Sequence, residues 1–394
     1  MTALHGVRVL DLSRVLAGPS CAQLMADMGA EVLKIEDRQG DENRRWIPVV
    51  EGRASNFWSV NRGKRGITLN LKSDRGQEIL AELVRQSDVL IENFPPATAS
   101  RLGLAHERLI AINPDLIHVS VTGYGSRGPL RERPGYDNML QAFTGMMAMT
   151  GEADRGPARL GPSVIDLATG MLAFGGVCAA LFARAEGRAR GQHIETSLLQ
   201  SGIALLGYHL TAYTMAGAIP GRTGSAVWHI VPYQNFRTRD GWLLVGANND
   251  GAWQRLCAVL EASDLAADPA YATAAGRVAR REELVAKLEP LFAPRPTAEW
   301  VERLDAVRIP CSPVHDIAEV LAHPQLEAMG LLHRVDDGHG GEVTLCGTPL
   351  GMSATPPVPG ARPPELGEHT EAVLRERLGL SDAEIEDLRR EEVI

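Results

Sequence analysis

The stretch Val7-Arg-Val-Leu-Asp-Leu-Ser-Arg-Val-Leu-Ala-Gly-Pro19, followed by Glu31-Val-Leu-Lys-Ile-Glu36, decides the fold class of this chain. Its first part, Val7–Asp11, is a short apolar run of the kind that forms a buried strand. A helical pattern then extends from Ala17 to Met28, and Glu31–Glu36 indicates a second strand. A strand, a helix and a second strand in this order predict the start of a parallel sheet with helices packed on it.

The same alternation continues along the first part of the chain. It predicts strands at Gly66–Asn70, Asp88–Glu92 and Leu116–Val121, with a helix from Asp74 to Gln86 after the first of them. We expect the strand at Leu116–Val121 to be the last of the series, in a Rossmann-like α/β domain. No GxGxxG motif follows the first strand and no P-loop occurs, so the sequence does not support binding of NAD or ATP.

The composition and the pattern of predicted elements change near Gly221. A strand at Trp242–Gly246 is followed by helices rich in Ala, Glu and Arg up to about Gly330. A proline-rich segment at 348–364 predicts an extended arm, and a pair of helices is expected after it. We therefore predict a large domain over 1–215, a smaller α+β domain over 221–330, and a C-terminal arm with helices over 331–394.

Composition narrows the class of protein. The chain has 394 residues, is 44% hydrophobic and 23% charged, and has a formal net charge of -9, which argues against a nucleic-acid partner. Its five cysteines are scattered without a CxxC pair, so neither a disulfide framework nor a zinc site is expected. The N-terminus has no basic leader pattern, and no segment approaches the ~20 apolar residues of a membrane span, so we expect a cytoplasmic protein without a membrane partner.

One carboxylate has an unusual setting. Gly161-Pro-Ser-Val-Ile-Asp-Leu-Ala-Thr-Gly170 places Asp166 at the start of a helix of small apolar residues. Unpaired backbone N–H groups and the helix dipole at this end should favour the ionised carboxylate. An ordinary helix cap is the alternative interpretation. Gly175 and Gly176, inside the helix, predict that another segment packs closely against it.

A series of motifs along the chain resembles the family III CoA-transferases, a group that includes formyl-CoA:oxalate transferase, carnitine CoA-transferase and the α-methylacyl-CoA racemases. The motifs are Val9-Leu-Asp-Leu-Ser13, Gly29-Ala-Glu-Val-Leu-Lys-Ile-Glu36, Asn61-Arg-Gly-Lys-Arg-Gly-Ile-Thr-Leu-Asn-Leu-Lys72, Asp88-Val-Leu-Ile-Glu-Asn-Phe94, Gly123-Tyr-Gly125, Pro134-Gly-Tyr-Asp137 and the helix of Asp166. The resemblance covers essentially the whole chain. It implies an interlocked homodimer, in which both chain ends form the Rossmann-like large domain and a small domain is inserted between them.

The resemblance also implies a chemistry. Asp166 matches the family's catalytic carboxylate, which attacks an acyl-CoA thioester and passes through an aspartyl anhydride and an aspartyl-CoA thioester. Coenzyme A is then a substrate, and no tightly bound cofactor is expected. The positions that match the family's CoA contacts are Leu16, Ala17, Arg38, Leu69, Asn70, Leu71, Lys72, Asn93, Phe94, Arg101, Arg133, Gly135 and Tyr136.

Within the family, the residue at 136 separates two activities. The racemases carry a histidine where this chain has Tyr136, and a phenol is a poorer proton shuttle at neutral pH than an imidazole. A transferase is therefore expected, with a 2-methylacyl-CoA racemase as the alternative. A CoA-binding protein without catalysis is a third hypothesis.

The substrate side of the site is also predicted from resemblance. Asp137 is expected to have a secondary role, and Trp228 and His229 are expected in the substrate pocket, in a loop that is similar to the branch using succinyl-CoA and short dicarboxylic acids. The remaining histidines, His193 among them, show no metal-binding spacing, so no metal is predicted.

Overall fold

A computed structural model describes all 394 residues of the chain. Its main sheet has six parallel strands in the order β5-β2-β1-β6-β7-β8. These strands are β1 (Arg8–Asp11), β2 (Glu31–Glu36), β5 (Arg65–Thr68), β6 (Val89–Glu92), β7 (Ile117–Thr122) and β8 (Gln192–Ser197). When these six strands are numbered by their order along the chain, the sheet has the strand order of a Rossmann fold, and the order reverses between β1 and β6, which is the switch point. The predicted α/β class with a parallel sheet is confirmed.

One strand was not expected. The prediction that Leu116–Val121 closes the series is wrong, because β8 adds a sixth strand beside β7. β8 lies at the edge of the sheet and only its last residue is fully buried. An edge strand of this kind lacks the continuous apolar run that identifies a strand buried on both faces.

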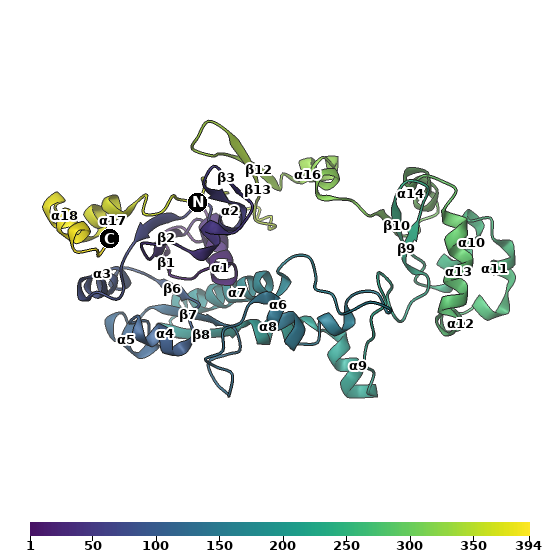
Figure 1. The fold of residues 1–394 in the computed structure, drawn as a ribbon, viewed down its shortest axis with the longest axis horizontal. Coiled ribbons are helices and arrows are strands. Elements are labelled where there is room, and N and C mark those ends of the chain that lie inside the picture. The colour runs from purple at the N-terminus through teal and green to yellow at the C-terminus, as the bar shows by residue number, and fades with distance from the viewer. The chain divides into compact units, whose positions relative to one another are not determined.

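Helices cover both faces of the sheet (Figure 1). One apolar core is built with α3, α4, α5, α17 and α18 on one face, and α1 packs against α7 on the other. The bounds are α1 (Ala17–Asp27), α3 (Asp74–Arg85), α4 (Pro96–Arg101), α5 (His106–Ile112), α7 (Val164–Ala185), α17 (Thr370–Leu378) and α18 (Asp382–Arg390). The two faces of the sheet are therefore covered by helices, and loops follow the ends of its strands.

The close approach of α7 to another segment occurs at a different glycine from the two that were predicted. A Cβ at Gly170 would lie 2.6 Å from the carbonyl oxygen of Ala17, so this glycine allows α1 and α7 to touch. Nothing lies within 4 Å of the corresponding position at Gly175, and Gly176 has only ordinary contact. The expectation for Gly175 and Gly176 is therefore wrong within a single chain.

Helix α7 is also long and apolar enough to cross a membrane by length and composition alone. The statement that no segment is apolar enough is therefore wrong. In its most apolar 18-residue window, 39% of the residues are buried. In this fold α7 packs on α1 and beside β7 and β8, and a single helix of this length and composition is weak evidence for a membrane span.

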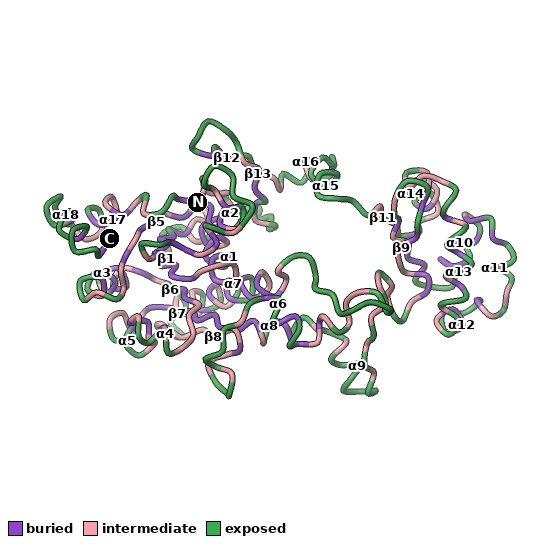
Figure 2. Tube along the Cα trace, in the orientation of Figure 1, coloured by how far each residue is buried: buried purple, intermediate pink, exposed green.

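The chain forms two compact units. The first comprises residues 1–144, 161–207 and 327–394, and the second comprises 145–160 and 208–326. Residues 145–160 and 208–215, which the sequence analysis placed in the large domain, thus belong to the smaller unit, and residues 327–330, expected in the small domain, belong to the first unit. In Figure 2, buried residues gather in the interior of each unit.

The smaller unit is built on an antiparallel sheet of three strands, in the order β11-β10-β9. Aromatic side chains such as Trp253, Phe292 and Trp300 fill its core. Its elements are α9 (Tyr208–Ala216), β9 (Tyr233–Arg237), β10 (Trp242–Gly246), α10 (Asp250–Val259), α11 (Ser263–Ala267), α12 (Ala274–Ala279), α13 (Arg281–Phe292), α14 (Thr297–Ala306), β11 (Cys311–Pro313) and α15 (Ile317–Leu321).

The C-terminal region belongs to the first unit. A hairpin packs its Leu345 against Phe57 and Trp58, and the segment 348–364 has neither helix nor strand. The backbone N–H of Asn70 donates to the carbonyl of Val393, which ties the chain end to the loop after β5. The remaining elements are β3 (Val49–Val50), β4 (Arg53–Ala54), α2 (Ser55–Val60), α6 (Asp137–Phe143), α8 (Leu198–Leu205), α16 (Pro324–Met329), β12 (Leu332–Asp336) and β13 (Glu342–Cys346), with short 3-10 helices at Glu42–Arg45, Met147–Met149 and Pro269–Tyr271.

Candidate active site

A pocket of about 210 Å³ opens at the switch point of the sheet, where the loops after β1 and β6 diverge. Its walls come from these two loops, from the end of β7 and the loop before α6, and from the start of α7. It is lined by Arg14, Val15, Leu16, Ala17, Glu42, Asn93, Phe94, Pro95, Val121, Thr122, Gly123, Arg131, Arg133, Pro134, Gly135, Tyr136, Asp166 and Leu198. Ligands of α/β sheets bind at this kind of crevice.

A second pocket, of about 530 Å³, shares Arg14 and Phe94 with the first. It is lined by Leu12, Arg14, Ile35, Glu36, Asp37, Arg38, Gln39, Leu69, Asn70, Leu71, Lys72, Phe94, Thr98, Arg101 and Leu102. Every residue predicted to contact CoA lines one of these two pockets. The structure thus brings together residues from the loops after β1, β2, β5, β6 and β7.

Asp166 lies in the first turn of α7 and is 8% exposed. No hydrogen bond or ion pair holds its carboxylate. Burial and the neighbouring Asp137 raise the pKa of Asp166 to about 7. The expectation that the helix end favours the ionised form is therefore wrong, because burial and a like charge outweigh the helix dipole here.

The N–H groups at the start of α7 are occupied by another carboxylate. Oδ2 of Asp137 accepts hydrogen bonds from the backbone N–H groups of Ile165, at 2.8 Å, and Asp166, at 3.2 Å. Gln141 donates to the other oxygen of Asp137. Because Asp137 accepts these N–H groups, it holds the turn that carries Asp166, and the Asp166 side chain does not cap the helix. Asp137 itself does not line the pocket.

Tyr136 and Arg133 line the first pocket as part of the loop before α6. The Tyr136 hydroxyl donates to Oε1 of Glu42 at 3.3 Å, and burial together with Glu42 raises the pKa of this phenol. The Arg133 guanidinium lies over the ring of Tyr124 and forms no ion pair. The pocket therefore contains a cation that is free to meet an anionic ligand.

The loop after β1 is held in a strained conformation. Val15 has φ of +68°, which is rare for a β-branched residue. Its N–H donates to the carboxylate of Asp41 at 3.2 Å, and its carbonyl accepts from the side chain of Asn43 at 2.7 Å. Asn93 holds the backbone of Arg14 with two further hydrogen bonds of 2.8 Å. These contacts fix the loop that lines both pockets.

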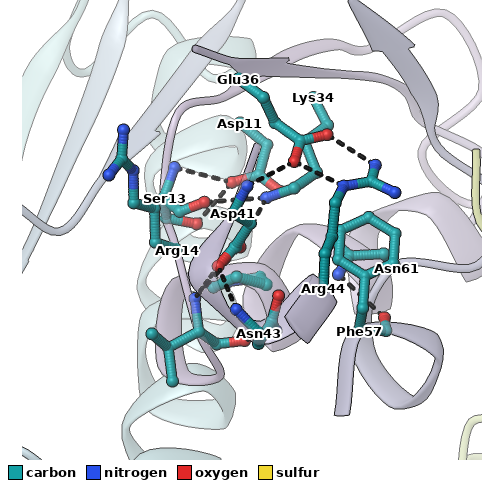
Figure 3. Close-up of polar contacts among 12 residues, drawn as sticks. Asp11, Ser13, Arg14, Lys34, Glu36, Asp41, Asn43, Arg44, Phe57 and Asn61 are labelled. Carbon is teal, nitrogen blue, oxygen red and sulfur yellow. Dashed lines mark hydrogen bonds and ion pairs between the residues drawn. The ribbon is translucent and has the colours of Figure 1, made fainter. Parts of the chain in front are cut away.

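Beneath this loop lies a network of buried charges (Figure 3). Asp11 and Lys34 are register partners on β1 and β2, and Lys64 donates to Asp11 at 2.7 Å. Lys34 donates to the carbonyl of Ser13 at 2.9 Å and to Asp41 at 3.2 Å. Burial acts to raise the pKa of Asp11, but Lys64 and Lys34 lower it below its ordinary range. The network connects the sheet to the Asp41 clamp on the β1 loop.

Sequence reasoning missed several of these residues. Arg14, Glu42 and Arg131 line the first pocket, and Asp41 anchors its loop. The turn Ser13-Arg-Val-Leu-Ala-Gly-Pro19 was the available signal, because the loop after the first strand of a parallel sheet borders the ligand crevice. Asp41 had no such signal, since it comes from a different loop.

The cations of the second pocket differ in their partners. Arg38 forms an ion pair of 3.0 Å with the exposed Glu392, and Arg101 donates to the hydroxyl of Thr98 at 3.3 Å. Lys72 is exposed and its ammonium forms no ion pair. A phosphate-bearing ligand could be met by all three, once Arg38 exchanges Glu392 for the ligand.

Trp228 and His229 belong to the smaller unit. They lie exposed in the loop before β9, and their rings meet edge to face with centroids 5.1 Å apart. Arg281 holds this loop by donating to the carbonyls of Val227 and Trp228, both at 2.8 Å.

A Rossmann-ordered sheet whose switch-point pocket contains an isolated carboxylate, with a basic pocket next to it, defines an α/β enzyme with room for a large anionic substrate. The chain matches the family described as CoA-transferase family III over residues 4–370. This chain belongs to that family.

Individual relatives agree with this assignment. The succinyl-CoA:glutarate CoA-transferase of Mus musculus is 38% identical over 390 residues, covering 98% of this chain and 89% of the relative. The succinyl-CoA:mesaconate CoA-transferase of Haloarcula marismortui is 37% identical over 394 residues, covering 95% and 96%. A crystal structure of a CAIB/BAIF family protein from Brucella suis matches with a TM-score of 0.87 and 37% identity, covering 95% of this chain and 99% of that one.

Proposed function

We propose that this enzyme transfers CoA from an acyl-CoA, with succinyl-CoA as the donor, to a short dicarboxylic acid, and that Asp166 is the nucleophile. The observation that carries the proposal is the Asp166 carboxylate itself. It lines the switch-point pocket, is nearly buried, and has no protein group bound to it. A buried carboxylate without a partner is destabilising, and catalytic sites are where such groups are found.

The proposed reaction proceeds by four exchanges at carbonyl carbons. Asp166 attacks the donor thioester, giving an acyl-aspartyl anhydride and CoA thiolate. The thiolate attacks the aspartyl carbonyl, which releases the donor acid and leaves an aspartyl-CoA thioester. The acceptor carboxylate displaces CoA to form a second anhydride, and the thiolate then takes the new acyl group. Asp166 is regenerated, and the number of thioesters is unchanged.

The two pockets divide the substrate between them in this proposal. The 530 Å³ pocket, with Arg38, Lys72 and Arg101, suits the phosphates of CoA. The 210 Å³ pocket, with Asp166, suits the acyl group. Arg14 and Phe94, which line both, would flank the chain that joins the two ends.

The dicarboxylate acceptor rests on chemistry and on the relatives. Arg133 has no ion-pair partner and lines the pocket of Asp166, so it can neutralise an acid brought to that carboxylate. The similar enzymes from mouse and Haloarcula marismortui are named for glutarate and mesaconate, two dicarboxylic acids. Trp228 and His229 line neither pocket, so their expected part in binding the acceptor rests on the family resemblance alone.

The pocket favours a transferase over the racemase alternative. No histidine lines either pocket, and Tyr136, the residue at the position in question, has a pKa raised above its ordinary value. Neither pocket therefore offers Asp166 an imidazole as a second acid–base group. Solvent deuterium at the α-carbon of an acyl-CoA would support the racemase instead.

The test is a mass-spectrometric assay of new thioesters. The enzyme is mixed with succinyl-CoA and glutarate, itaconate, mesaconate, citramalate, oxalate or acetate in turn. We expect a new acyl-CoA with a dicarboxylic acid and no loss of total thioester. In a parallel reaction, hydroxylamine should convert the intermediate to a hydroxamate on the peptide that contains Asp166. Turnover by Asp166→Asn would exclude the proposed nucleophile.

We also propose that the enzyme works as a homodimer, in the interlocked form that the family resemblance implies. Large apolar side chains on neighbouring helices of the first unit are exposed in the single chain. They are Met139 and Phe143 on α6, Met171, Leu172 and Phe182 on α7, and Ile203 and Leu205 on α8. Exposed apolar side chains gathered on packed helices are typical of association sites, and a second copy would also fill the open space at Gly175. Light scattering should give twice the chain mass.

A further inference from the structure

Three histidines that are far apart in sequence converge on one face of the main sheet. His118 and His193 are register partners on β7 and β8, and His106 is the first residue of α5. The ring centroids of His118 and His193 are 4.6 Å apart, as are those of His106 and His193. One ring nitrogen from each lies within 4.8 Å of the others.

The hydrogen bonds of this cluster are incomplete in a specific way. Nε2 of His193 and Nε2 of His118 face the hydroxyl of Ser120, at 2.8 and 3.4 Å, and Oε1 of Glu92 lies 3.9 Å from Nε2 of His118. Nδ1 of His118 and Nδ1 of His106 are buried and have no partner. Buried polar atoms without partners are rare in folded proteins and call for a ligand.

We propose that His106, His118 and His193 form a binding site for a divalent transition-metal ion, with Zn²⁺ as the natural candidate. Imidazole nitrogens suit zinc, and three protein ligands with an open fourth position form a known type of zinc site. The unpartnered Nδ1 atoms of His106 and His118 supply two ligands, and a ring nitrogen of His193 supplies the third.

The surroundings match those of metal-binding histidines elsewhere. Such histidines donate their other ring N–H to an oxygen atom, which fixes the tautomer, and the Ser120 hydroxyl lies 3.4 Å from Nε2 of His118, where it can accept this N–H. His118 is 2% exposed, whereas His106 and His193 are partly exposed, which gives an ion a path from solvent.

Binding requires a small rearrangement. The rings are nearly parallel, with interplanar angles of 9° to 16°. Nitrogens around a tetrahedral zinc ion are about 3.3 Å apart, given Zn–N bonds of about 2.0–2.1 Å. The rings must therefore turn about their Cβ–Cγ bonds and draw together. The bound ion would fasten α5 to the sheet beside β6, whose end carries the pocket residues Asn93 and Phe94.

The test uses the full-length enzyme without an affinity tag, freed of metal by a chelator. Titration with Zn²⁺ in a calorimeter should show one site per chain, and Co²⁺ should give the visible absorption of a nitrogen-ligated ion without a thiolate charge-transfer band. We expect His118→Gln and His193→Gln to weaken binding by at least about 100-fold, and Ser120→Ala by about 10-fold.

His323→Gln is the matched control, because His323 lies near His315 in the smaller unit and this pair should contribute nothing to the site. If the variants of the buried His118 do not fold, His106→Gln decides the question, since His106 is partly exposed at a helix start. Equal Zn²⁺ affinity in the wild type and His106→Gln, or equal losses in His323→Gln and His118→Gln, would overturn the proposal. Both readouts are independent of CoA transfer.

Discussion

Two buried carboxylates in this enzyme, Asp11 and Asp166, are shifted in opposite directions. Asp11 is completely buried, yet Lys64 and Lys34 lower its pKa below the ordinary range. Asp166 is slightly less buried, and its pKa rises to about 7 because burial and Asp137 act on it without a compensating cation. Burial alone therefore does not decide the state of a carboxylate. The partners do, and the carboxylate without one is available for chemistry.

The surroundings of the two groups explain the contrast. The ammonium of Lys64 has three acceptors, which are Asp11, the carbonyl of Pro19 and the side chain of Asn61, at 2.7 to 2.9 Å. Every N–H of this buried cation is thus satisfied. The neighbouring charge that acts on Asp166 is another carboxylate, that of Asp137. The first arrangement holds the β1 loop, and the second leaves a reactive group at the bottom of the pocket.

The largest expected effect comes from removing the reactive carboxylate. Asp166→Asn keeps the size of the side chain but cannot form an anhydride, so we expect CoA transfer to fall by about 10³-fold or more. The measurement is the initial rate of new acyl-CoA formation. Binding of CoA, followed by calorimetry, should stay close to that of the wild type, since the phosphate pocket is untouched. A variant that retains a tenth of the rate would contradict the proposed role of Asp166.

Removing the cation that pairs with Asp11 should lower the stability of the fold. Lys64→Met leaves Asp11 buried beside a single remaining cation, Lys34, and we expect the free energy of unfolding to fall by about 3–5 kcal/mol. Urea denaturation measures this. The control is Lys72→Met, the same substitution at an exposed lysine, which should change stability by less than about 0.5 kcal/mol. If both variants lost a similar free energy of unfolding, the buried ion pair would contribute no more to stability than an exposed lysine does.

Asp166→Asn should also stabilise the protein, in contrast to Lys64→Met. The pKa of Asp166 in the fold, about 7, is above its ordinary 3.8, so folding favours the protonated acid. This contribution is fully present below pH 3.8 and is lost as the pH rises through about 7. At about pH 8 the variant should be more stable by about 2–4 kcal/mol, and near pH 4 the difference should almost vanish. A gain of equal size at both pH values would point to a cause other than ionisation.

The main sheet could be predicted because its strands are short apolar runs separated by helical patterns. Strands at Glu31–Glu36 and near Val7–Asp11 and Asp88–Glu92 lie where they were expected. The edge strand β8 could not be predicted from such a run, because one side of it is partly exposed and its sequence is polar. Residues 145–160 were likewise assigned to the wrong part, since membership in a compact unit depends on long-range contacts that local patterns do not contain.

The site was predicted residue by residue only where a motif identified it. Asp166 stood out as an acid at the start of an apolar helix, but its pKa depends on Asp137, which is 29 residues earlier and meets it only in the fold. The histidine cluster was missed for the same reason, because β7, β8 and α5 bring together side chains with no regular spacing. Electrostatics and ligand sites are properties of neighbours in space.

The smallest expected effect is the most direct test of why Asp166 differs from Asp11. Asp137→Asn retains an oxygen that can accept the N–H groups of Ile165 and Asp166, but removes the negative charge that raises the pKa of Asp166. Because the ionised nucleophile is the active form, the rate of CoA transfer should rise with pH through about 7 in the wild type. In Asp137→Asn this rise should move to lower pH, with a similar plateau. A lower plateau at an unchanged midpoint would instead show that Asp137 acts only by holding the helix turn, and that burial alone sets the pKa of the nucleophile.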